Sequence, residues 1–221
     1  MSSRVHYEET RCRSALNKVE GMGFRWSLNP YRGCVHGCHY CFARRYHAYY
    51  DLSPGKDFTN IILVKVNVAQ VLRKELSRPS WRRESVTLGT ATDPYQPIEG
   101  KYRLTRSCLE AFVDLRSPIS LVTKGTMIVR DADLLAELTR KAGCVVCFSI
   151  TSLDNDLVRE LEPGTPPPQK RLKALEHLVQ AGVIAGVLLA PIVPGITDDP
   201  ESLKGVVKAA AAHGARFLGA R

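Results

Sequence analysis

Short apolar runs, most of them β-branched, alternate with amphipathic stretches along most of the chain. Residues 61–66 read Ile-Ile-Leu-Val-Lys-Val, whereas residues 131–141 carry Leu134, Leu135 and Leu138 at helical spacing. Continuous apolar strands separated by helices are typical of a parallel sheet covered by helices. The pattern predicts strands at residues 24–28, 61–66, 85–88, 119–123, 145–150, 184–189 and 216–218, and helices at 68–76, 105–115, 131–141, 169–181 and 200–213.

These elements make about six or seven strand–helix units, which predicts an α/β barrel or partial barrel of the TIM type. Functional residues are then expected at the C-terminal ends of the strands. A doubly wound sheet is the alternative, but no GxGxxG motif follows any predicted strand. Residues 1–24 are polar and patternless and are predicted to be an N-terminal extension, with residues 25–221 as the core domain. Because the chain ends directly after a strand-like run, we expect a barrel truncated at its C-terminal side.

The composition is that of a globular protein, with 44% hydrophobic and 24% charged residues among 221, and excludes wholesale disorder. No apolar run reaches the ~18 residues of a membrane-spanning helix, and the N-terminus lacks the apolar segment of a secretory signal. We therefore expect no membrane partner. Seven cysteines in such a chain predict a reducing, cytoplasmic location, and thiols used in metal binding or catalysis rather than in disulfides.

The net charge of +9 is concentrated in one part of the sequence. Residues 1–83 hold 15 Lys and Arg against 6 Asp and Glu, whereas residues 84–221 hold 16 of each. A basic segment attracts polyanions, so nucleic acid is the expected partner, with a solvated basic surface as the alternative. The basic and aromatic residues concerned are Arg44, Arg45, Arg73, Lys74, Arg78, Arg82 and Arg83 with Tyr46, Tyr49, Tyr50 and Trp81. The three tyrosines have helical spacing, which predicts that they pack on the sheet.

The most informative local feature is a loop with three cysteines, Cys34, Cys38 and Cys41, in the spacing C-x3-C-x2-C. Three thiolates on one loop can ligate three irons of a 4Fe–4S cluster and leave the fourth iron open to a cofactor or substrate. A closed zinc site formed with His36 or His39 is one alternative. A cluster used only for electron transfer is another, although a fourth cysteine ligand is then expected.

The cysteine spacing, with an aromatic residue before the last cysteine, resembles that of the radical S-adenosylmethionine (SAM) superfamily. Further segments narrow the resemblance to its spore photoproduct lyase-like, DNA repair photolyase-related group: NPYRGCVHGCHYCFAR, GTATDPYQPIE, VTK, LEP and PIVPG, in this order. The resemblance implies a partial (β/α)6 barrel, a 4Fe–4S cluster on Cys34, Cys38 and Cys41, and SAM bound at the open iron. It also implies a lyase-like reaction, in which the reduced cluster cleaves SAM and the resulting 5′-deoxyadenosyl radical abstracts a substrate hydrogen.

In that superfamily the strand ends hold SAM, and six residues here are candidates: Tyr40, Gly89, Thr90, Thr92, Lys124 and Ser149. Residues 89–93 stand where the superfamily usually has Gly-Gly-Glu, so their carbonyls and hydroxyls are expected to accept from the SAM amino group. Lys124 is expected to pair with the SAM carboxylate. Ser149 is expected to bond the ribose if its face of the strand lines the barrel. The alternatives are a plain strand-to-loop turn, a lysine that reaches solvent and a serine bonded to backbone.

Several other residues keep open interpretations. Cys144 and Cys147 are spaced C-x2-C, but residues three apart on a strand point to opposite faces, so both are predicted to be buried and unbonded. Lys65 interrupts an apolar strand and needs a partner, either the cysteine loop or an acid such as Glu99. Arg171 either bonds a carboxylate across the top of the barrel or lies on a helix surface.

The resemblance also implies partners. An electron donor such as flavodoxin or ferredoxin is expected to reduce the cluster. Damaged DNA or modified nucleic acid is the expected substrate, with a peptide or a small molecule as the alternative. Spore photoproduct lyase itself uses a cysteine just ahead of the SAM-binding loop as hydrogen donor, whereas this chain has Leu88, Gly89 and Thr90 there. Reversal of thymine dimers is therefore not implied unless Cys147 or a tyrosine takes that role.

Overall fold

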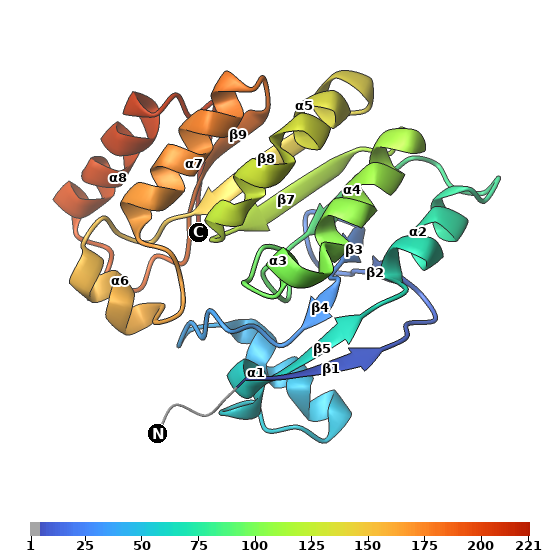
Figure 1. The fold of residues 1–221 in the computed structure, drawn as a ribbon. Coiled ribbons are helices and arrows are strands. Elements are labelled where there is room, and N and C mark those ends of the chain that lie inside the picture. Colours follow the sequence, from blue (N-terminus) through green and yellow to red (C-terminus); the bar gives the residue numbers. More distant parts are fainter. Residues whose placement is uncertain (1–4) are drawn as a thin grey trace.

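In the computed structural model, which describes residues 5–221, the strands form two sheets (Figure 1). The larger sheet has the order β10-β9-β8-β7-β6-β3-β2, and the smaller one has the order β1-β5-β4. The larger sheet comprises β2 (Asn17–Lys18), β3 (Trp26–Leu28), β6 (Val86–Leu88), β7 (Ile119–Thr123), β8 (Cys144–Ser149), β9 (Ile184–Leu189) and β10 (Leu218–Ala220). The smaller sheet comprises β1 (His6–Thr10), β4 (Tyr31–Arg32) and β5 (Ile61–Lys65).

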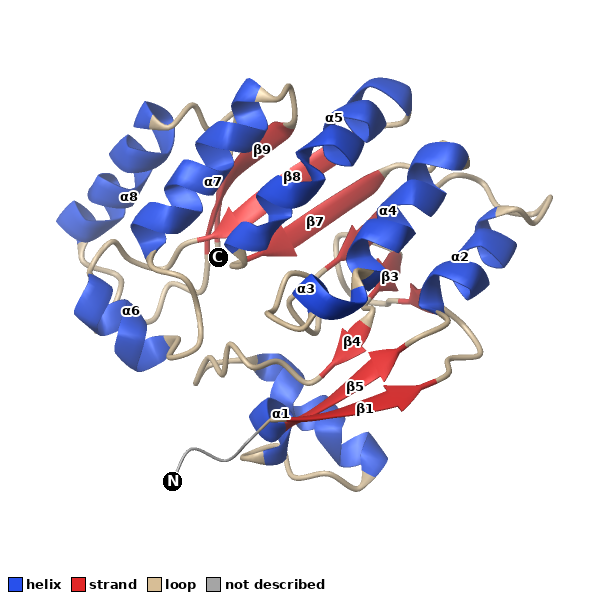
Figure 2. Ribbon diagram, viewed as in Figure 1, coloured by secondary structure: helices blue, strands red, loops and turns tan. Residues whose placement is uncertain are grey.

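Helices cover the larger sheet along one face (Figure 2). The helices of the chain are α1 (Asp57–Asn60), α2 (Val68–Leu76), α3 (Glu99–Tyr102), α4 (Leu104–Asp114), α5 (Ala132–Lys141), α6 (Asn155–Leu161), α7 (Pro168–Gln180) and α8 (Pro200–Ala212), with the 3-10 helices η1 (Phe42–Tyr50) and η2 (Thr126–Asp131). Of these, α1 and η1 lie beside the smaller sheet instead. In the larger sheet, β3, β6, β7, β8, β9 and β10 all run parallel, and β2 is antiparallel at the sheet edge. Six parallel strands with helices outside them form a partial (β/α)6 barrel, which confirms the predicted fold class.

Local signals explain why the predicted long helices match the observed ones to within one residue at each end. Asp199 caps α8 by accepting from the backbone N–H of Ser202, and Asp154 caps α6, a shorter helix that was not predicted. Both α7 and α8 begin at a proline, whose fixed φ suits the first turn. Gly143 follows α5 with a φ of 109°, a conformation that side chains disfavour and that ends the helix.

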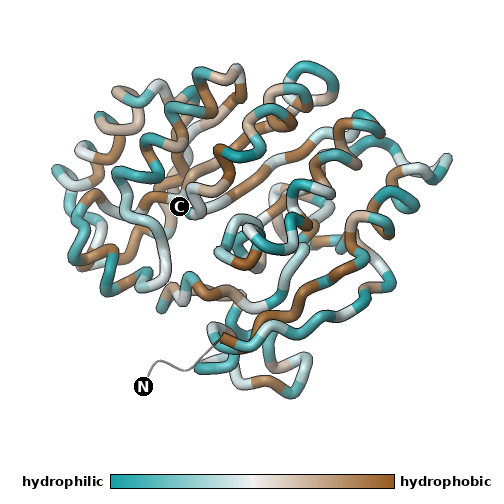
Figure 3. The backbone as a smooth tube through the Cα atoms, in the orientation of Figure 1, coloured by the Kyte–Doolittle hydropathy of each residue, from teal (hydrophilic) through white to brown (hydrophobic). Residues whose placement is uncertain are grey.

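The main core lies between the larger sheet and its helices. Apolar segments follow the strands in Figure 3, whereas the helices alternate between apolar and polar residues. On β8, Cys144, Val146 and Phe148 are buried, and Val145 and Cys147 on the other face are half-buried. The two cysteines therefore point to opposite faces and are free thiols, as predicted, although Cys147 is less buried than expected.

The smaller sheet differs from the predicted arrangement. The apolar run at residues 61–66 is β5, which lies outside the larger sheet and pairs with β1 in parallel and with β4 in antiparallel orientation. β1 falls in the segment that looks patternless, because its side chains are mostly polar and exposed. The last strand starts two residues later than predicted. Residues 1–24 thus contribute β1 and β2, and their separation from a core at 25–221 stays a prediction.

The tyrosines of η1 do not pack on the sheet, which corrects the prediction from their spacing. The helix is attached instead through Ala43 and His47, and the His47 ring lies 5.3 Å from that of Phe58. Tyr49 is 78% exposed and Tyr50 is 44% exposed. No helix among the described residues has both the length and the apolar character that a membrane crossing needs.

Candidate functional site

The three cysteines lie on a compact loop between β4 and η1, here called the cysteine loop (residues 33–41). Cys34 and Cys38 are buried, and Cys41 is half-buried at the start of η1. Gly33 and Gly37 both have positive φ, of 81° and 66°. A Cβ on Gly33 would lie 2.6 Å from the Ile61 carbonyl oxygen, so the loop approaches β5 more closely than any side chain allows.

The TDPYQP segment braces this loop on both sides of Cys34. Gln96 is fully buried; its amide donates to the Gly33 carbonyl at 3.1 Å and accepts from the Val35 N–H at 3.2 Å. Asp93 lies 3.3 Å from Nδ1 of His36, also buried. Sequence reasoning missed this role of Asp93 and Gln96, although both stand in the quoted motif.

Electrostatics hold His36 and Asp93 together as a charged pair. Burial alone would lower the pKa of His36, but Cys34 and Asp93 outweigh it and raise that pKa to about 10. Burial alone would raise the pKa of Asp93, but His36 and hydrogen bonds from the end of β7 bring it well below its usual value. The pair therefore holds His36 in place as a brace of the loop.

Further contacts hold the loop carbonyls. Arg44 donates from Nη2 to the Gly37 carbonyl at 2.7 Å and from Nε to the Cys38 carbonyl at 3.1 Å. On the other side, the Gly164 N–H donates to the His36 carbonyl at 2.9 Å. Arg44 is thus engaged with the protein itself rather than free for phosphate, contrary to its place in the predicted basic set.

The donor chemistry of the loop fits an iron–sulfur cluster. Cys34, Cys38 and Cys41 are free thiols close enough for the charge of one to raise the pKa of another. Burial raises the pKa of Cys38 to about 12, so its thiolate needs a cation beside it, which bound iron supplies. Among residues 5–221 no group of three His, Cys, Asp or Glu side chains is already arranged to hold a metal ion.

A continuous row of hydrogen bonds runs along the carboxyl ends of the parallel strands. At the end of β3, the Asn29 side chain accepts from the Ala91 N–H at 3.0 Å and donates to the Thr90 hydroxyl at 3.1 Å. After β6, Asp93 accepts from the Thr123 hydroxyl and from the Lys124 N–H, both at 2.7 Å. Each strand end is therefore bonded to the loop of the next one.

The row continues across the last strands. Lys124 Nζ donates to the Ser149 hydroxyl at 2.8 Å, and that hydroxyl donates to the Ala190 carbonyl, beyond β9, at 2.9 Å. We call the connected residues Asn29, Asp93, Lys124, Ser149 and Ala190 the carboxyl-edge belt. It unites Lys124 and Ser149, two of the predicted SAM contacts, in one direct hydrogen bond.

The other predicted SAM contacts, near the end of β6, also make contacts within the protein itself. Gly89 has a φ of 83°, and a Cβ there would lie 2.0 Å from the Val122 carbonyl oxygen, so its close approach is to β7. Thr92 is buried and donates to the Tyr31 carbonyl at 3.1 Å. The Thr90 hydroxyl is half-buried, with Asn29 as its partner. The backbone carbonyls of this turn are the groups that stay suited to an ammonium ligand.

A buried carboxylate, Glu162, joins the cysteine loop to the belt. It accepts from the Tyr40 hydroxyl, from the Thr151 hydroxyl at 3.1 Å and from Arg171 at 2.5 Å. Lys124 Nζ lies 3.9 Å from the Glu162 carboxylate and 5.6 Å from the centre of the Tyr40 ring. Tyr40 and Lys124, far apart in sequence, thus meet around one acid.

The charges around Glu162 balance. Burial would raise the pKa of Glu162, but Lys124 and Arg171 bring it below its usual value. Burial and the neighbouring Glu162 raise the pKa of Tyr40, so its phenol stays protonated and donates. Arg171 is fully buried and bonds the carboxylate of Glu162, nine residues before it, so the helix-surface interpretation is wrong and the carboxylate partner is a local one. The sequence analysis did not predict Glu162 as a site residue, although it is the acid of the LEP segment.

Lys65, on β5, contacts the belt at the backbone of Asn29. Its Nζ donates to the Asn29 carbonyl at 2.9 Å, and burial lowers its pKa to about 8. Neither predicted partner is correct, since Glu99 accepts instead from Tyr31 at 2.5 Å and from Arg130 at 2.8 Å. The lysine is buried because it satisfies a strand-end carbonyl.

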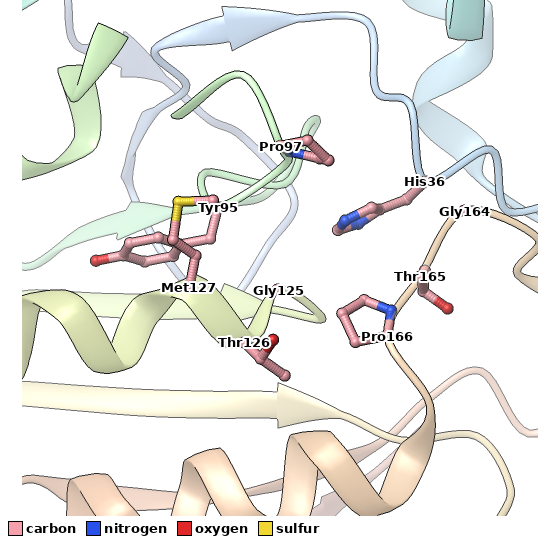
Figure 4. Close-up of a pocket in the computed structure, with 9 residues that line it drawn as sticks. All are labelled: His36, Tyr95, Pro97, Gly125, Thr126, Met127, Gly164, Thr165 and Pro166. Atoms are coloured by element: carbon pink, nitrogen blue, oxygen red, sulfur yellow. The ribbon is translucent and has the colours of Figure 1, made fainter. Parts of the chain in front are cut away.

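A cavity of about 300 Å³ opens beside His36, between the loops that follow β6, β7 and β8 (Figure 4). Its lining residues are His36, Tyr95, Pro97, Gly125, Thr126, Met127, Gly164, Thr165 and Pro166. None of the six predicted SAM contacts lines it. The volume is at the lower limit of small-molecule sites.

The predicted basic and aromatic set does not form one surface. Arg73 pairs with Asp114 at 2.6 Å. Trp81 packs edge-on against Trp26, with ring centres 5.7 Å apart, and donates to the Ser117 hydroxyl. These residues have structural partners, so the charge excess of residues 1–83 does not by itself mark a nucleic-acid groove.

Solved structures share the fold. Spore photoproduct lyase, in a structure with bound AdoMet and dinucleoside spore photoproduct, has a TM-score of 0.69 and 20% identity, covering 97% of this chain and 60% of that one. Streptococcus suis SuiB bound to S-adenosylmethionine has a TM-score of 0.54 and 14% identity, covering 88% of this chain and 38% of that one.

Sequence relatives agree with the fold. An uncharacterized protein of Mycobacterium tuberculosis is 46% identical over 97% of this chain, which spans 65% of that protein's length. A Methanocaldococcus jannaschii protein is 27% identical over 90% of this chain and 72% of its own length. The radical SAM Nalpha-GlyT isomerase of Pseudomonas phage M6 is 29% identical over 76% of this chain and 33% of its own length. The family model described as Radical SAM superfamily matches residues 28–204, and the chain is accordingly a member of that superfamily.

Proposed function

We propose that the protein holds a 4Fe–4S cluster on Cys34, Cys38 and Cys41 and uses it to cleave SAM reductively. Bound together, cluster and SAM supply a 5′-deoxyadenosyl radical that takes a hydrogen atom from the substrate. The observation that supports this most is the closeness of the cysteine loop to the belt. Tyr40 and Lys124 meet at Glu162, and the Lys124 charge counteracts the burial that raises the pKa of Cys38.

The belt offers SAM complementary polar groups in this proposal. The Lys124 ammonium has three N–H donors, and Ser149 takes one of them, so another is available to the SAM carboxylate. The carbonyls around Gly89 and Thr90 accept from the SAM amino group, while Asn29 holds that turn in place. Ser149 bonds the ribose by exchanging its present acceptor, the Ala190 carbonyl.

We propose nucleic acid as the substrate; the net charge of +9 is compatible with a polyanion, although the basic residues of the first 83 positions do not by themselves mark a groove. A solved structure of spore photoproduct lyase, whose fold is shared, is a complex with dinucleoside spore photoproduct, which is consistent with this class. The turn after β6 has no cysteine, and Cys147, on the Ser149 face of β8, is half-buried. We therefore propose hydrogen abstraction from nucleic acid without a specific repair reaction.

Two further features belong to the proposal. The cluster needs an outside electron donor such as flavodoxin or ferredoxin. A reducing, cytoplasmic location suits a chain whose seven cysteines are all free thiols.

The test is an anaerobic reconstitution with iron and sulfide, compared among wild type, Cys38→Ala and Cys12→Ala. Cys12 is a half-buried thiol outside the cysteine loop and serves as the matched control. We expect a dithionite-reduced cluster EPR signal that changes on adding SAM, and 5′-deoxyadenosine by chromatography. Cys38→Ala should lose both, and Cys12→Ala should keep both.

Other outcomes separate the alternatives. Zinc bound without iron would contradict the radical chemistry, and a cluster that ignores SAM would point to electron transfer alone. Binding of a labelled single-stranded oligonucleotide at rising salt tests the substrate class. A steep loss of affinity with salt supports nucleic acid, and no binding at low salt favours a peptide or small molecule.

A further inference from the structure

Three exposed aromatic side chains and one half-buried one, Tyr46, lie on η1 together with two arginines on and beside it. Phe42 is 55%, Tyr49 is 78% and Tyr50 is 44% exposed. We call the set Phe42, Tyr46, Tyr49, Tyr50, Arg32 and Arg45 the aromatic–arginine face. Only Ala43 and His47 of η1 are buried, so the fold of η1 does not require large aromatics on its outer side.

The face is ordered by its own contacts. The Arg32 guanidinium lies 4.1 Å from the centre of the Tyr50 ring, and that of Arg45 lies 5.1 Å from the centre of Tyr46. Tyr46 and Tyr49 are stacked, with ring centres 6.2 Å apart. Aromatic and arginine side chains held in this way lose little conformational entropy on binding, which is why they are enriched at protein interfaces.

The face adjoins the cysteine loop. Cys41 is the N-cap of η1, and Phe42 is the next residue. Cys34 and Cys38 are 7% and 8% exposed, whereas Cys41 is only half-buried. Consecutive Cα atoms are about 3.8 Å apart, so the surface at Phe42 is one residue step from a cluster ligand. This is the shortest route along the chain from the cysteine loop to an exposed aromatic side chain.

We propose that the aromatic–arginine face docks an acidic one-electron carrier, a flavin or iron–sulfur protein, that reduces the cluster. This inference rests on the proposed function, because it needs a cluster behind Cys41. The reduced carrier loses one electron and is oxidised. The cluster gains that electron and passes from the 2+ to the 1+ state, and no bond or proton is exchanged.

Charge favours an acidic protein as the occupant. Four basic residues stand on and around η1 against two acids: Arg32, Arg44, Arg45 and Lys56 against Asp51 and Asp57. Opposite charge raises the encounter rate of a transient partner, and redox encounters bury little surface, so a small face suffices.

The location of the aromatic–arginine face argues against the substrate as its binding partner. Hydrogen abstraction takes place where SAM is held, so a nucleic-acid substrate must bring its reacting base to the belt. Figure 1 shows residues 42–50, in light blue, beside α1 and beneath β1 and β5, away from α7 and α8. An electron carrier has no such requirement, because it needs only to approach Cys41.

The test measures electron transfer itself and leaves SAM out. Dithionite-reduced, desalted cluster protein is mixed anaerobically in a stopped-flow instrument with oxidised flavodoxin, and flavin reduction is followed by its visible absorbance. This direction is downhill without SAM and uses the same docked complex. The variants are Arg45→Glu and Tyr49→Ala. The matched control is Lys208→Glu, an equal charge reversal at an exposed position of α8.

We expect both variants to slow the second-order rate about tenfold at low salt, with Lys208→Glu close to wild type. Cluster content and reduction by dithionite should be unchanged in all three. If a variant fails to take up iron, the wild-type protein still tests the proposal. Its second-order rate of electron transfer to flavodoxin should fall with rising salt, and a rate that does not depend on salt would overturn the proposal. Wild-type rates in both variants would also overturn it.

Two further outcomes separate this inference from its alternatives. Variants that lose oligonucleotide binding but keep the flavodoxin rate would assign the face to nucleic acid and overturn the proposal. Wild-type protein that exchanges electrons with flavodoxin but forms no 5′-deoxyadenosine with dithionite and SAM would contradict the proposed function alone.

Discussion

Glu162→Gln replaces the buried carboxylate with an amide of nearly the same shape and so isolates its charge. Glu162 and Arg171 are both fully buried, and their closest atoms are 2.5 Å apart. In the variant, Arg171 keeps its bonds to the Ser149 carbonyl at 2.9 Å and the Pro166 carbonyl at 2.7 Å. It loses its counter-charge in a place that water does not reach.

The expected loss is large because a buried charge is left uncompensated. Removing one partner of a buried ion pair costs about 3–5 kcal/mol, and the retained carbonyl contacts put the variant near the lower value. The matched control is Asp156→Asn on α6, which breaks the exposed pair with Arg159 at 3.1 Å. An exposed pair of this kind contributes less than about 1 kcal/mol.

The assay is urea unfolding of the reduced, metal-free protein, followed by circular dichroism at neutral pH. The folded pKa of Glu162 is lowered, so its stabilisation is full above the ordinary Glu pKa of about 4.3 and is lost as the pH falls through the folded value. Wild type and Glu162→Gln should therefore converge in acid. A loss below about 1 kcal/mol at neutral pH, or no convergence, would refute the reasoning.

Three further changes have calculable outcomes. Lys65→Met should raise the unfolding free energy at pH 7 by up to about 3 kcal/mol, since burial lowers the lysine pKa to about 8. The wild-type unfolding free energy should rise between pH 8 and about 10.4, and that of the variant should not, as urea titrations at each pH would show. Gly89→Ala should destabilise by several kcal/mol more than Gly21→Ala in thermal unfolding, because both have positive φ but only Gly89 would clash, at 2.0 Å. Gln96→Leu should weaken cluster retention about tenfold in a chelator competition, and equal retention would contradict its bracing role.

The fold class and the long helices were predictable because the spacing of apolar and polar residues within each segment indicates its secondary structure. The helix at Val68–Leu76 has amphipathic spacing over its whole length, and its observed bounds equal the predicted ones. The cysteine triplet was likewise readable, since all of its members lie within one short segment. The smaller sheet was not, because β4 has two residues and β1 shows mostly polar side chains.

The buried charges were harder to foresee for a different reason. Arg171 stands on a helix where a charged residue usually faces water, and Glu162 lies nine residues before it. Tyr40 is separated from Glu162 by 122 positions. Charge burial depends on which partners the fold brings together, and a single sequence without pair information does not specify distant partners. Asn29 and the turn after β6, about 61 positions apart, are a second case.

Strand register explains how residues from distant segments form one belt. The pairing of Thr123 with Phe148 places the next residues, Lys124 and Ser149, side by side, and these are the two that share a hydrogen bond. In the same way, the pairing of Leu28 with Leu88 brings Asn29 level with the turn that it holds.

Side chains alternate faces along a strand, so a slip of one residue between β7 and β8 would turn Ser149 away from Lys124. Apolar residues on the buried face, among them Leu121 opposite Val146, help to fix the register. Packing of the core therefore selects the register, and the register in turn assembles the polar groups at the strand ends. A substitution deep in β7 or β8 that shifts the pairing should abolish the belt without touching any of its members.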